Sequence, residues 1–561
     1  MSAHTDKALL RRYKAAKKYY TTANYEAAKA ILAPLTDLAQ KNDITPYALF
    51  YYALSAYHNE EAALAENILM TLAAEFPGWE QQDEVWYWLG QLRCEAKDHS
   101  AGLAYLAKIS DQSLEKSVEQ MKGHFLQQLD DLEALQTLHR QYPEDSVVAK
   151  ALLDLMARQP FIKRDLALMH TLTRDFDLTV MDHDPLQNVA SLKKNSYNVA
   201  VFFPFFVDEV DYEEEESSNA FVIALYQGIK MAVAALADQG VNINLFAYDT
   251  KKDPETTAAL LEQEELKGMD LIIGPLYAAT IPLVAEFAQA HQINVFNPLS
   301  ENADVVRENP FVFLFQSSLE TQARKAAEFT LQHVEEDSRV GIIYGTSSKD
   351  FIRAHAYKQY IEHSTGQEVA MMLALAPEDA SSLLSTLNEA KRADQNEEEE
   401  APMLNLDHLT HLYLASEDEL TVASVLSAVA ITRLKPYIIG HEAWLQQSLL
   451  TVDQLQQLRL YLLAPHHVDY TKESIHAFRS SFYDQSAQYP THYACVGYEM
   501  MLFLGQMLGQ HGVYFQKHWE QQFAPGTLFQ GVSYGKHHDN QYVPIIQLRG
   551  DALEVCNSVR E

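Results

Sequence analysis

The sequence predicts a multidomain protein in which an all-α helical array precedes an α/β module, with the change at Ser196. Before Ser196 the apolar residues recur at helical spacing, and after it short apolar runs alternate with helical patterns. Buried apolar runs separated by helices are typical of a parallel sheet with helices on both faces, and such sheets bind ligands beyond the carboxyl ends of their strands. The runs span 197–205, 243–249, 271–275, 295–300, 311–317 and 340–346.

Composition narrows the classes of function. The chain of 561 residues is too long for one core, and its formal charge of −34 argues against nucleic-acid binding, which depends on clustered Lys and Arg. Cys94, Cys495 and Cys556 show no metal-ligand spacing.

No apolar run of about 18 residues occurs, so we expect no transmembrane segment. The first residues show neither a signal segment nor a lipidation cysteine, which predicts a cytoplasmic protein or one whose signal has been replaced.

The first 190 residues contain a repeat with a step of 37 residues. Small residues at fixed positions let paired helices approach closely, which is typical of a solenoid. Trp86-x-x-Leu89-Gly90 and Phe76-Pro77 resemble parts of the tetratricopeptide repeat, which implies an interaction module with a protein partner. The small residues are Ala16, Ala53 and Gly90 in one series and Ala28, Ala65 and Gly102 in the other, and helical patterns over 117–130, 131–141, 146–158 and 163–175 continue the array.

The aromatic residues of this array allow two interpretations. They either line a concave surface for a protein or peptide partner, or they serve only the packing of a generic helical array. The residues in question are Tyr13, Tyr19, Tyr51, Trp86 and Trp88.

The α/β region resembles a known family. The order of its features resembles that of the type I periplasmic-binding-protein fold of amino-acid and amide receptors. The features are a strand, a long helix from Asn219, a Gly turn, a strand ending in Asp249-Thr250, and Gly274-Pro275 after the next strand. The resemblance covers about 197–548. Within this fold, the chain most resembles receptor-like proteins of Bacteroidetes that carry an added N-terminal module. It implies two lobes that close on a ligand.

Later segments support the resemblance and set the expected lobes. Arg339 to Gly345 resembles the strand that opens the second lobe, and Gly497-Tyr498-Glu499 has Glu where the family usually has Asp. The first lobe is expected over about 197–316 plus a return segment, and the second over about 317–440 plus part of the chain beyond that range. The chain is expected to cross back at 438–441.

The resemblance and the loop positions together predict a ligand site. A zwitterionic ligand needs acceptors for its amine and hydroxyl or backbone donors for its carboxylate. By resemblance, Leu299 and Ser300 lie where the family places main-chain and hydroxyl contacts. The predicted ligand-binding residues are Tyr277, Leu299, Ser300, Gln316, Ser317, Ser348, Asp350, Ser416, His441 and Glu442.

Each of these residues also has a structural alternative. Ser at such positions can simply cap the next helix, as expected for Ser300, Ser318 and Ser348. Asp350 and Glu442 are then solvated, and His441 only hydrogen-bonds a loop. Leu276, Tyr277 and Leu299 are bulky enough to fill the cleft.

The remaining signals predict no chemistry. His466-His467 and His537-His538 are not expected to share a metal, because neighbours on a strand point to opposite faces. The acidic runs 213–216 and 394–400 are expected to be surface loops. No catalytic motif is found, so we predict no catalytic residue, metal or cofactor.

The function predicted is therefore a non-enzymatic solute-binding or receptor-like protein for a small polar molecule of the amino-acid or amide type. The helical repeats would contact a protein partner, and the resemblance implies the periplasm or cell envelope. The alternative is a regulatory scaffold that resembles the lipoprotein activators of peptidoglycan synthases and needs no small ligand.

Overall fold

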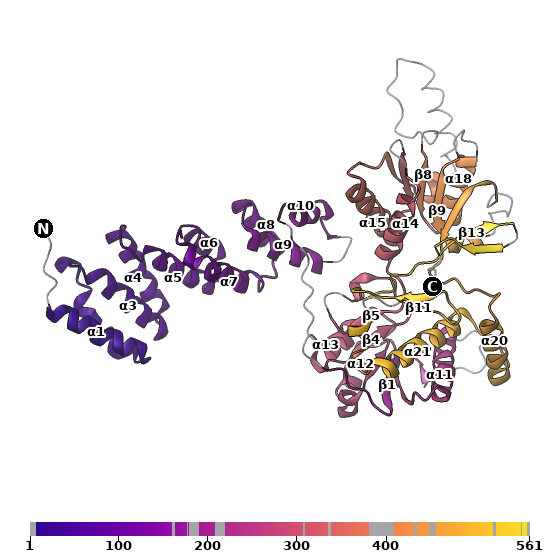
Figure 1. Cartoon of the computed structure of the whole chain (residues 1–561), viewed down its shortest axis with the longest axis horizontal. Coiled ribbons are helices and arrows are strands. Elements are labelled where there is room, and N and C mark those ends of the chain that lie inside the picture. Colours follow the sequence, from indigo (N-terminus) through magenta and orange to yellow (C-terminus); the bar gives the residue numbers. More distant parts are fainter. Residues whose placement is uncertain are drawn as a thin grey trace, which may run out of the picture. The chain divides into compact units, whose positions relative to one another are not determined.

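The computed structural model describes residues 7–159, 163–176, 178, 190–207, 219–306, 309–334, 338–380, 409–430, 435–447, 456–519, 523–550 and 552–557. The chain divides into two units (Figure 1). The first comprises Met1–Gln159 and Arg164–Met181, and the second comprises Pro160–Lys163 and Asp182–Glu561. The acidic runs 213–216 and 394–400 lie outside the described residues.

The first unit is an array of helices that pack as successive pairs. Helix α1 packs against α2, α3 against α4, and α5 against α6. The helices are α1 (Lys7–Thr21), α2 (Tyr25–Leu32), α3 (Thr45–His58), α4 (Ala62–Glu75), α5 (Gln82–Glu95), α6 (His99–Leu106), α7 (Glu115–Leu126), α8 (Leu132–Gln141), α9 (Ser146–Arg158) and α10 (Leu166–Phe176).

The small residues of the 37-residue step lie at the contacts between paired helices. Ala16, Ala28, Ala53 and Ala65 are all buried. A Cβ atom added to Gly102 would lie 3.1 Å from the carbonyl oxygen of Gly90 and 2.4 Å from Cys94 Sγ. Only a residue without a side chain permits this approach of α5 and α6. The prediction of closely paired helices is therefore confirmed.

Packing accounts for most of the aromatic residues in this array. The rings of Tyr13 and Tyr51 meet edge-on at 6.0 Å, and Trp86 stacks on Tyr105 at 5.9 Å. Tyr19 differs, since 42% of its surface is exposed.

The second unit begins with the first lobe, which is built on a five-stranded parallel sheet of order β2-β1-β3-β4-β5. Four of its five strands end earlier than predicted, because the last residues of those apolar runs form the loops, whereas the second strand ends where its run ends. The strands are β1 (Tyr197–Phe203), β2 (Ile243–Asp249), β3 (Leu271–Ile273), β4 (Asn294–Asn297) and β5 (Val312–Leu314), and the helices between them are α11 (Ala220–Asp238), α12 (Pro254–Leu261) and α13 (Ile281–His291).

Two helices distant in sequence form the centre of this lobe. Helix α11 packs along α21 (His492–His511), with both in the lobe's core (Figure 1). A Cβ atom at Gly228 would lie 2.1 Å from the carbonyl oxygen of Ala494, and one at Gly497 equally close to that of Leu225. By length and composition α11 is apolar enough to cross a membrane, but one face of it lies in the first-lobe core, and helices that pack into a core can meet the same criterion.

The second lobe is built on a seven-stranded sheet of order β14-β13-β10-β9-β8-β6-β7. Strands β6 to β10 run parallel, and β13 and β14 continue the sheet in antiparallel pairing. The elements are α14 (Leu319–Leu331), β6 (Val340–Tyr344), α15 (Ser348–Thr365), β7 (Met371–Ala374), α16 (Pro377–Ala380), β8 (His411–Ala415), α18 (Glu419–Ala430), β9 (Tyr437–His441), β10 (Arg459–Leu463), β13 (Ile545–Arg549) and β14 (Ala552–Val555).

The crossing predicted at 438–441 is wrong. Strand β9 pairs with β8 on one side and β10 on the other, so it lies inside the second-lobe sheet. The apolar run with its glycine suggested a hinge. Gly440 instead allows the Trp444 ring to pack against the strand, since a Cβ atom at this position would lie 1.9 Å from the ring. The chain leaves this lobe after β10 and returns to the first-lobe core through α20 (Glu473–Ser486), α21 and the hairpin β11 (Phe523–Pro525) and β12 (Gly531–Ser533).

Candidate functional site

The first-lobe contribution to the candidate site comes directly after β4. Asn297 Oδ1 accepts hydrogen bonds from the backbone N–H groups of Leu299 (3.1 Å) and Ser300 (2.7 Å). Its Nδ2 donates to the carbonyl of Pro275 at 2.6 Å. This buried amide therefore fixes the turn that presents Glu301 at the carboxyl end of the sheet.

Glu301 reaches cationic and polar groups of the second lobe. Its carboxylate lies 3.1 Å from Lys349 Nζ and 3.6 Å from His466 Nε2, and it accepts a 2.8 Å hydrogen bond from Gln322 Nε2. Burial acts to raise the pKa of Glu301, but the hydrogen bond to His466 and the charges of Arg353 and Lys349 outweigh it and hold that pKa well below its ordinary value. Glu301 is thus an ionised carboxylate held by the opposite lobe.

Arg353 lies at the centre of the second-lobe groups. It is 2% exposed on α15, where its Nη1 pairs with Glu417 and its Nη2 donates to Gln322 Oε1 at 3.3 Å. The same Nη2 lies 4.0 Å from Glu301. We call the set of contacting residues Glu301, Gln322, Lys349, Arg353, Glu417, His441, Glu442 and His466 the interlobe cluster.

The ends of β9 and β10 supply three further titratable groups of this cluster, His441, Glu442 and His466. His441 is 8% exposed, and burial, aided by the charge of Arg353, lowers its pKa to about 3. Its Nδ1 accepts a 3.2 Å hydrogen bond from the backbone N–H of Ala443, so the neutral ring carries its proton on Nε2. Burial raises the pKa of Glu442 to about 7, and its carboxylate accepts a 2.8 Å bond from the backbone N–H of His466.

His466 has the opposite electrostatic balance. Burial acts to lower its pKa, but the hydrogen bond to Glu301 and the charges of Glu442 and Glu301 raise it above the ordinary value. The imidazolium form, which donates from both ring nitrogens, is therefore favoured by its surroundings.

Several buried polar atoms of the cluster have no partner within the described part of the chain. They are Arg353 Nε, His441 Nε2 and His466 Nδ1, together with Ser317 Oγ. Ser317 adjoins the cluster, because Gln322 Nε2 donates to its carbonyl at 3.1 Å. A buried donor without an acceptor costs about 1–3 kcal/mol, so such groups in one place indicate that an acceptor from outside the chain completes them.

The serines predicted as helix caps divide into one confirmed and two wrong. Ser318 caps α14 by accepting from the backbone N–H of Thr321 at 3.1 Å. Ser347, not Ser348, caps α15 by accepting from Asp350 N–H. Ser300 caps no helix, since its Oγ accepts from Asn302 N–H within a turn.

Among the predicted ligand-binding residues Ser348 is exposed, and the others are at least partly buried. Asp350 is 6% exposed and burial raises its pKa, so the expectation of a solvated carboxylate is wrong for it, as it is for Glu442. Ser416 Oγ accepts from Asp418 N–H at 3.2 Å, and Gln316 Nε2 donates to the carbonyl of Pro298 at 3.2 Å. Leu276 and Leu299 pack against the first-lobe core, and Tyr277 lies under Lys252 Nζ, 4.3 Å from the ring centre.

Sequence reasoning predicted only His441 and Glu442 of this cluster, and it missed Glu301, Gln322, Lys349, Arg353, Glu417 and His466. A usable signal existed for Arg353, which shares a helical stripe with the buried Tyr357 and Ile361 at spacings of four residues. A cation on an otherwise apolar stripe indicates a buried ion pair. Glu301 and Glu417 come after strand ends without any distinguishing pattern, and only the fold brings them together.

Glu499 has a structural role at the other side of the first lobe. It is 4% exposed, and its two carboxylate oxygens accept 2.7 Å hydrogen bonds from the backbone N–H groups of Thr527 and Leu528. Glu499 therefore holds the loop before β12. Within the part of the chain that the structure describes, no group of three or more His, Cys, Asp or Glu could hold a metal ion.

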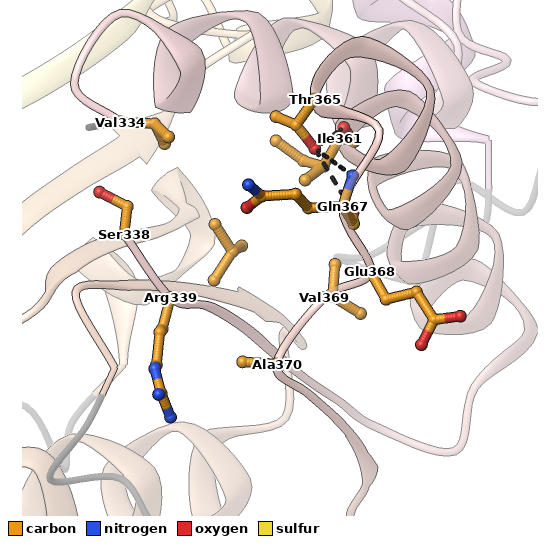
Figure 2. A pocket seen from close by; sticks show the side chains of 10 residues that line it. Val334, Ser338, Arg339, Ile361, Thr365, Gln367, Glu368, Val369 and Ala370 are labelled. Carbon is orange, nitrogen blue, oxygen red and sulfur yellow. Dashed lines mark hydrogen bonds between the residues drawn. The ribbon is translucent and has the colours of Figure 1, made fainter. Parts of the chain in front are cut away.

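A surface hollow in the second lobe lies away from the cluster. It has a volume of about 670 Å³ and is lined by residues around the start of β6, including Val340, Thr365 and Val369 (Figure 2). Figure 2 shows the charged ends of Arg339 and Glu368 pointing away from the hollow. The hollow lies at the amino ends of β6 and β7, and the charged ends of its lining residues point away from it, so the interlobe cluster is the better candidate site.

Two α/β lobes with a polar cluster between the carboxyl ends of their strands define a two-lobed binding protein. The periplasmic-binding-protein family model matches residues 217–514, just over half of the chain, and the protein belongs to this family. No curated protein sequence matches the chain.

Similar solved structures come from several bacteria. One is a putative branched-chain amino acid ABC transporter protein from Rhodospirillum rubrum, at 12% identity and a TM-score of 0.49, covering 64% of this chain and 99% of that one. Another is full-length LpoA from Haemophilus influenzae, at 11% identity and a TM-score of 0.45, covering 98% of this chain and 95% of that one. A third is an ABC transporter substrate-binding protein from Desulfitobacterium hafniense in complex with Leu, at 16% identity and a TM-score of 0.41, covering 64% and 99%.

Proposed function

We propose that this protein is a non-enzymatic binding protein that holds a small polar ligand of the amino-acid or amide type at the interlobe cluster. The observation that carries the proposal is the set of buried polar atoms without partners on Arg353, His441, His466 and Ser317. Family members are generally non-enzymatic and extracytoplasmic, which supports a binding role in the periplasm or cell envelope.

The cluster offers both kinds of group that a zwitterion needs. The free N–H groups of Arg353, His441 and His466 can donate to a carboxylate or amide oxygen. Burial raises the pKa values of Glu442 and of Asp350, which interacts with the charges of Arg353 and Glu417 of the cluster. A neighbouring ammonium group would stabilise the ionised forms of both carboxylates. Ligand binding would thus satisfy both the unpartnered donors and the buried acids.

Thermal unfolding with a panel of amino acids and amides tests the proposal. A compound that binds only the folded state adds about 2.7 kcal/mol at 100 times its dissociation constant, which is a measurable rise in Tm. If no compound raises the Tm, the solute-binding proposal is wrong.

Two neighbouring serines give a matched pair for this assay. Ser317→Ala removes an unpartnered hydroxyl, so it should weaken the ligand-induced shift without lowering the Tm of the free protein. Ser318→Ala removes the cap of α14, so it should lower the Tm of the free protein by the equivalent of about 1 kcal/mol and leave the ligand-induced shift intact. If the two variants change the ligand-induced shift in Tm equally, Ser317 does not contact the ligand.

A second candidate function is a regulatory scaffold similar to the lipoprotein activators of peptidoglycan synthases. The observation that favours it is Glu301, a carboxylate of the chain itself that already engages Lys349, Gln322 and His466. In this case the helical repeats, which we propose to be tetratricopeptide-like, and the two-lobed unit both serve protein contacts. Two results together would favour this candidate over the first: the chain binds a peptidoglycan synthase, and no compound of the panel raises its Tm.

A further inference from the structure

Helix α1 carries a line of positive charge in a strongly acidic protein. The whole chain has 43 Lys and Arg against 77 Asp and Glu, yet the 15 residues of α1 contain six basic residues and no acidic one. Four of them recur at spacings of four, three and four residues, which places them on one face of a helix. We call these four residues, Lys7, Arg11, Lys14 and Lys18, the basic stripe.

The basic stripe lies opposite the face that packs into the array. The inward face consists of Leu9, Tyr13, Ala16 and Tyr20, which are buried or partly buried in the cores shared with α2 and α3. All four residues of the stripe are exposed. Packing therefore fixes α1 with the stripe turned to solvent.

The charges of the stripe are not neutralised within the described part of the chain. None of its four residues makes an ion pair there, whereas Lys29 of the next helix pairs with Glu61 at 2.7 Å. The basic residue beside the stripe, Lys17, lies over the Tyr51 ring at 5.0 Å instead of pairing with an acid. The stripe is thus a local concentration of positive charge that no described acidic side chain pairs with, in a protein of charge −34.

The form of the stripe fits a plane better than a discrete anion. It extends for about 17 Å along one helix face, at about 1.5 Å per residue, so its charges are spread along a line instead of converging on one group. Three of its four members are lysines, whose flexible stems and point charges suit a diffuse layer of anionic groups better than a bidentate site. Screening over about 8–10 Å limits repulsion from the rest of the acidic chain.

We propose that the basic stripe of α1 docks on a membrane surface rich in anionic phospholipid headgroups. Polybasic segments are attracted to such surfaces, and each added charge strengthens binding roughly fivefold near the surface. This interaction is separate from ligand binding at the interlobe cluster, and it would orient the helical array on a membrane.

Sedimentation of the full chain with lipid vesicles tests the proposal. We expect binding to vesicles of phosphatidylcholine containing about one-third phosphatidylglycerol, little binding to pure phosphatidylcholine, and release as salt rises from about 0.05 M to about 0.5 M. Replacing the four residues of the stripe by Gln should lower the partition coefficient at least about tenfold.

A matched control removes four positive charges elsewhere. Lys116, Lys163, Lys193 and Lys536 are exposed and make no ion pair within the described residues. Their replacement by Gln changes the net charge equally and should leave vesicle binding within about twofold of the wild-type value. Circular dichroism of both variants checks that the helical array is intact.

Three outcomes would overturn the proposal. The first is no binding of the wild-type chain to anionic vesicles at low salt, and the second is equal loss of binding in the stripe and control variants. The third is stripe-dependent binding to polyglutamate without binding to vesicles, which would identify an acidic protein segment as the partner.

Discussion

Glu301 Oε1 lies 3.6 Å from His466 Nε2, which joins the loop after β4 in the first lobe to the segment after β10 in the second. Each residue changes the titration of the other, since Glu301 has a lowered pKa and His466 a raised one. The contact therefore stabilises the folded unit only while Glu301 is ionised and His466 is protonated.

The first prediction concerns His466. Because its pKa is raised in the folded state, its stabilising contribution is complete below the ordinary value of about 6.5 and is lost as pH rises through the folded value. His466→Gln should therefore reduce the fall in unfolding free energy between pH 6 and pH 9, roughly, as measured by urea unfolding. His476→Gln, an exposed position, should leave the pH profile unchanged, and an unchanged profile in His466→Gln would contradict the assignment.

Glu442 gives a second pH dependence in a lower range. Its pKa rises from 4.5 to about 7 on folding, so the folded state binds more protons than the unfolded state between these values. Stability should then fall by about 1–3 kcal/mol as pH increases across this range. Glu442→Gln keeps an acceptor for the N–H of His466 and should flatten this part of the profile. The exposed Glu368→Gln is the control, and a slope equal to wild type in Glu442→Gln would refute the prediction.

The third prediction concerns the buried cation of the cluster. Arg353→Met removes the partner of Glu417, a partly exposed carboxylate, and weakens the hold on Glu301, so we expect a loss of about 1.5–3 kcal/mol in unfolding free energy. Arg459→Met removes an exposed arginine over the Tyr437 ring and should cost about 1 kcal/mol or less. Similar losses in the two variants, measured by urea unfolding, would show that the cluster does not contribute to stability.

The fourth prediction concerns the packing of α11 on α21. Gly497→Ala would place a methyl group 2.1 Å from the carbonyl oxygen of Leu225, and neither backbone can move without separating the helices. We expect a loss of at least about 3 kcal/mol or failure to fold. Gly268→Ala, where nothing lies within 4 Å of the added atom, should change stability by less than about 1 kcal/mol. Near-wild-type stability of Gly497→Ala would show that the two helices pack less closely than described.

The elements of both lobes were largely predictable because their strands are apolar runs with no competing pattern. The run at 243–249 matches β2 at both ends, and that at 340–346 contains β6. The crossing between lobes was not predictable, since Ile438 and Ile439 look alike whether they lie in a hinge or in the middle of a sheet. Only the pairing of β9 with β10 decides between them.

The candidate site was predictable only in part. His441 and Glu442 lie at the end of a strand, so their place at a carboxyl end could be predicted, and they do lie in the cluster. Glu301 and Arg353 meet across the two lobes, and such a contact depends on the folding of segments that are 52 residues apart in the sequence. Their roles depend on three-dimensional proximity, which no local pattern encodes.

The antiparallel pairing of β13 with β10 has a consequence for synthesis of the chain on the ribosome. The second-lobe sheet lacks two strands until residues 545–555 have emerged, and by then α20, α21 and the hairpin of β11 and β12, which complete the first lobe, have already been made. The lobe that begins later thus stays open at one edge until near the end of translation. We therefore expect the second lobe to depend on chaperones for longer than the first, and nascent chains stalled before β13 to be sensitive to proteases in the second lobe.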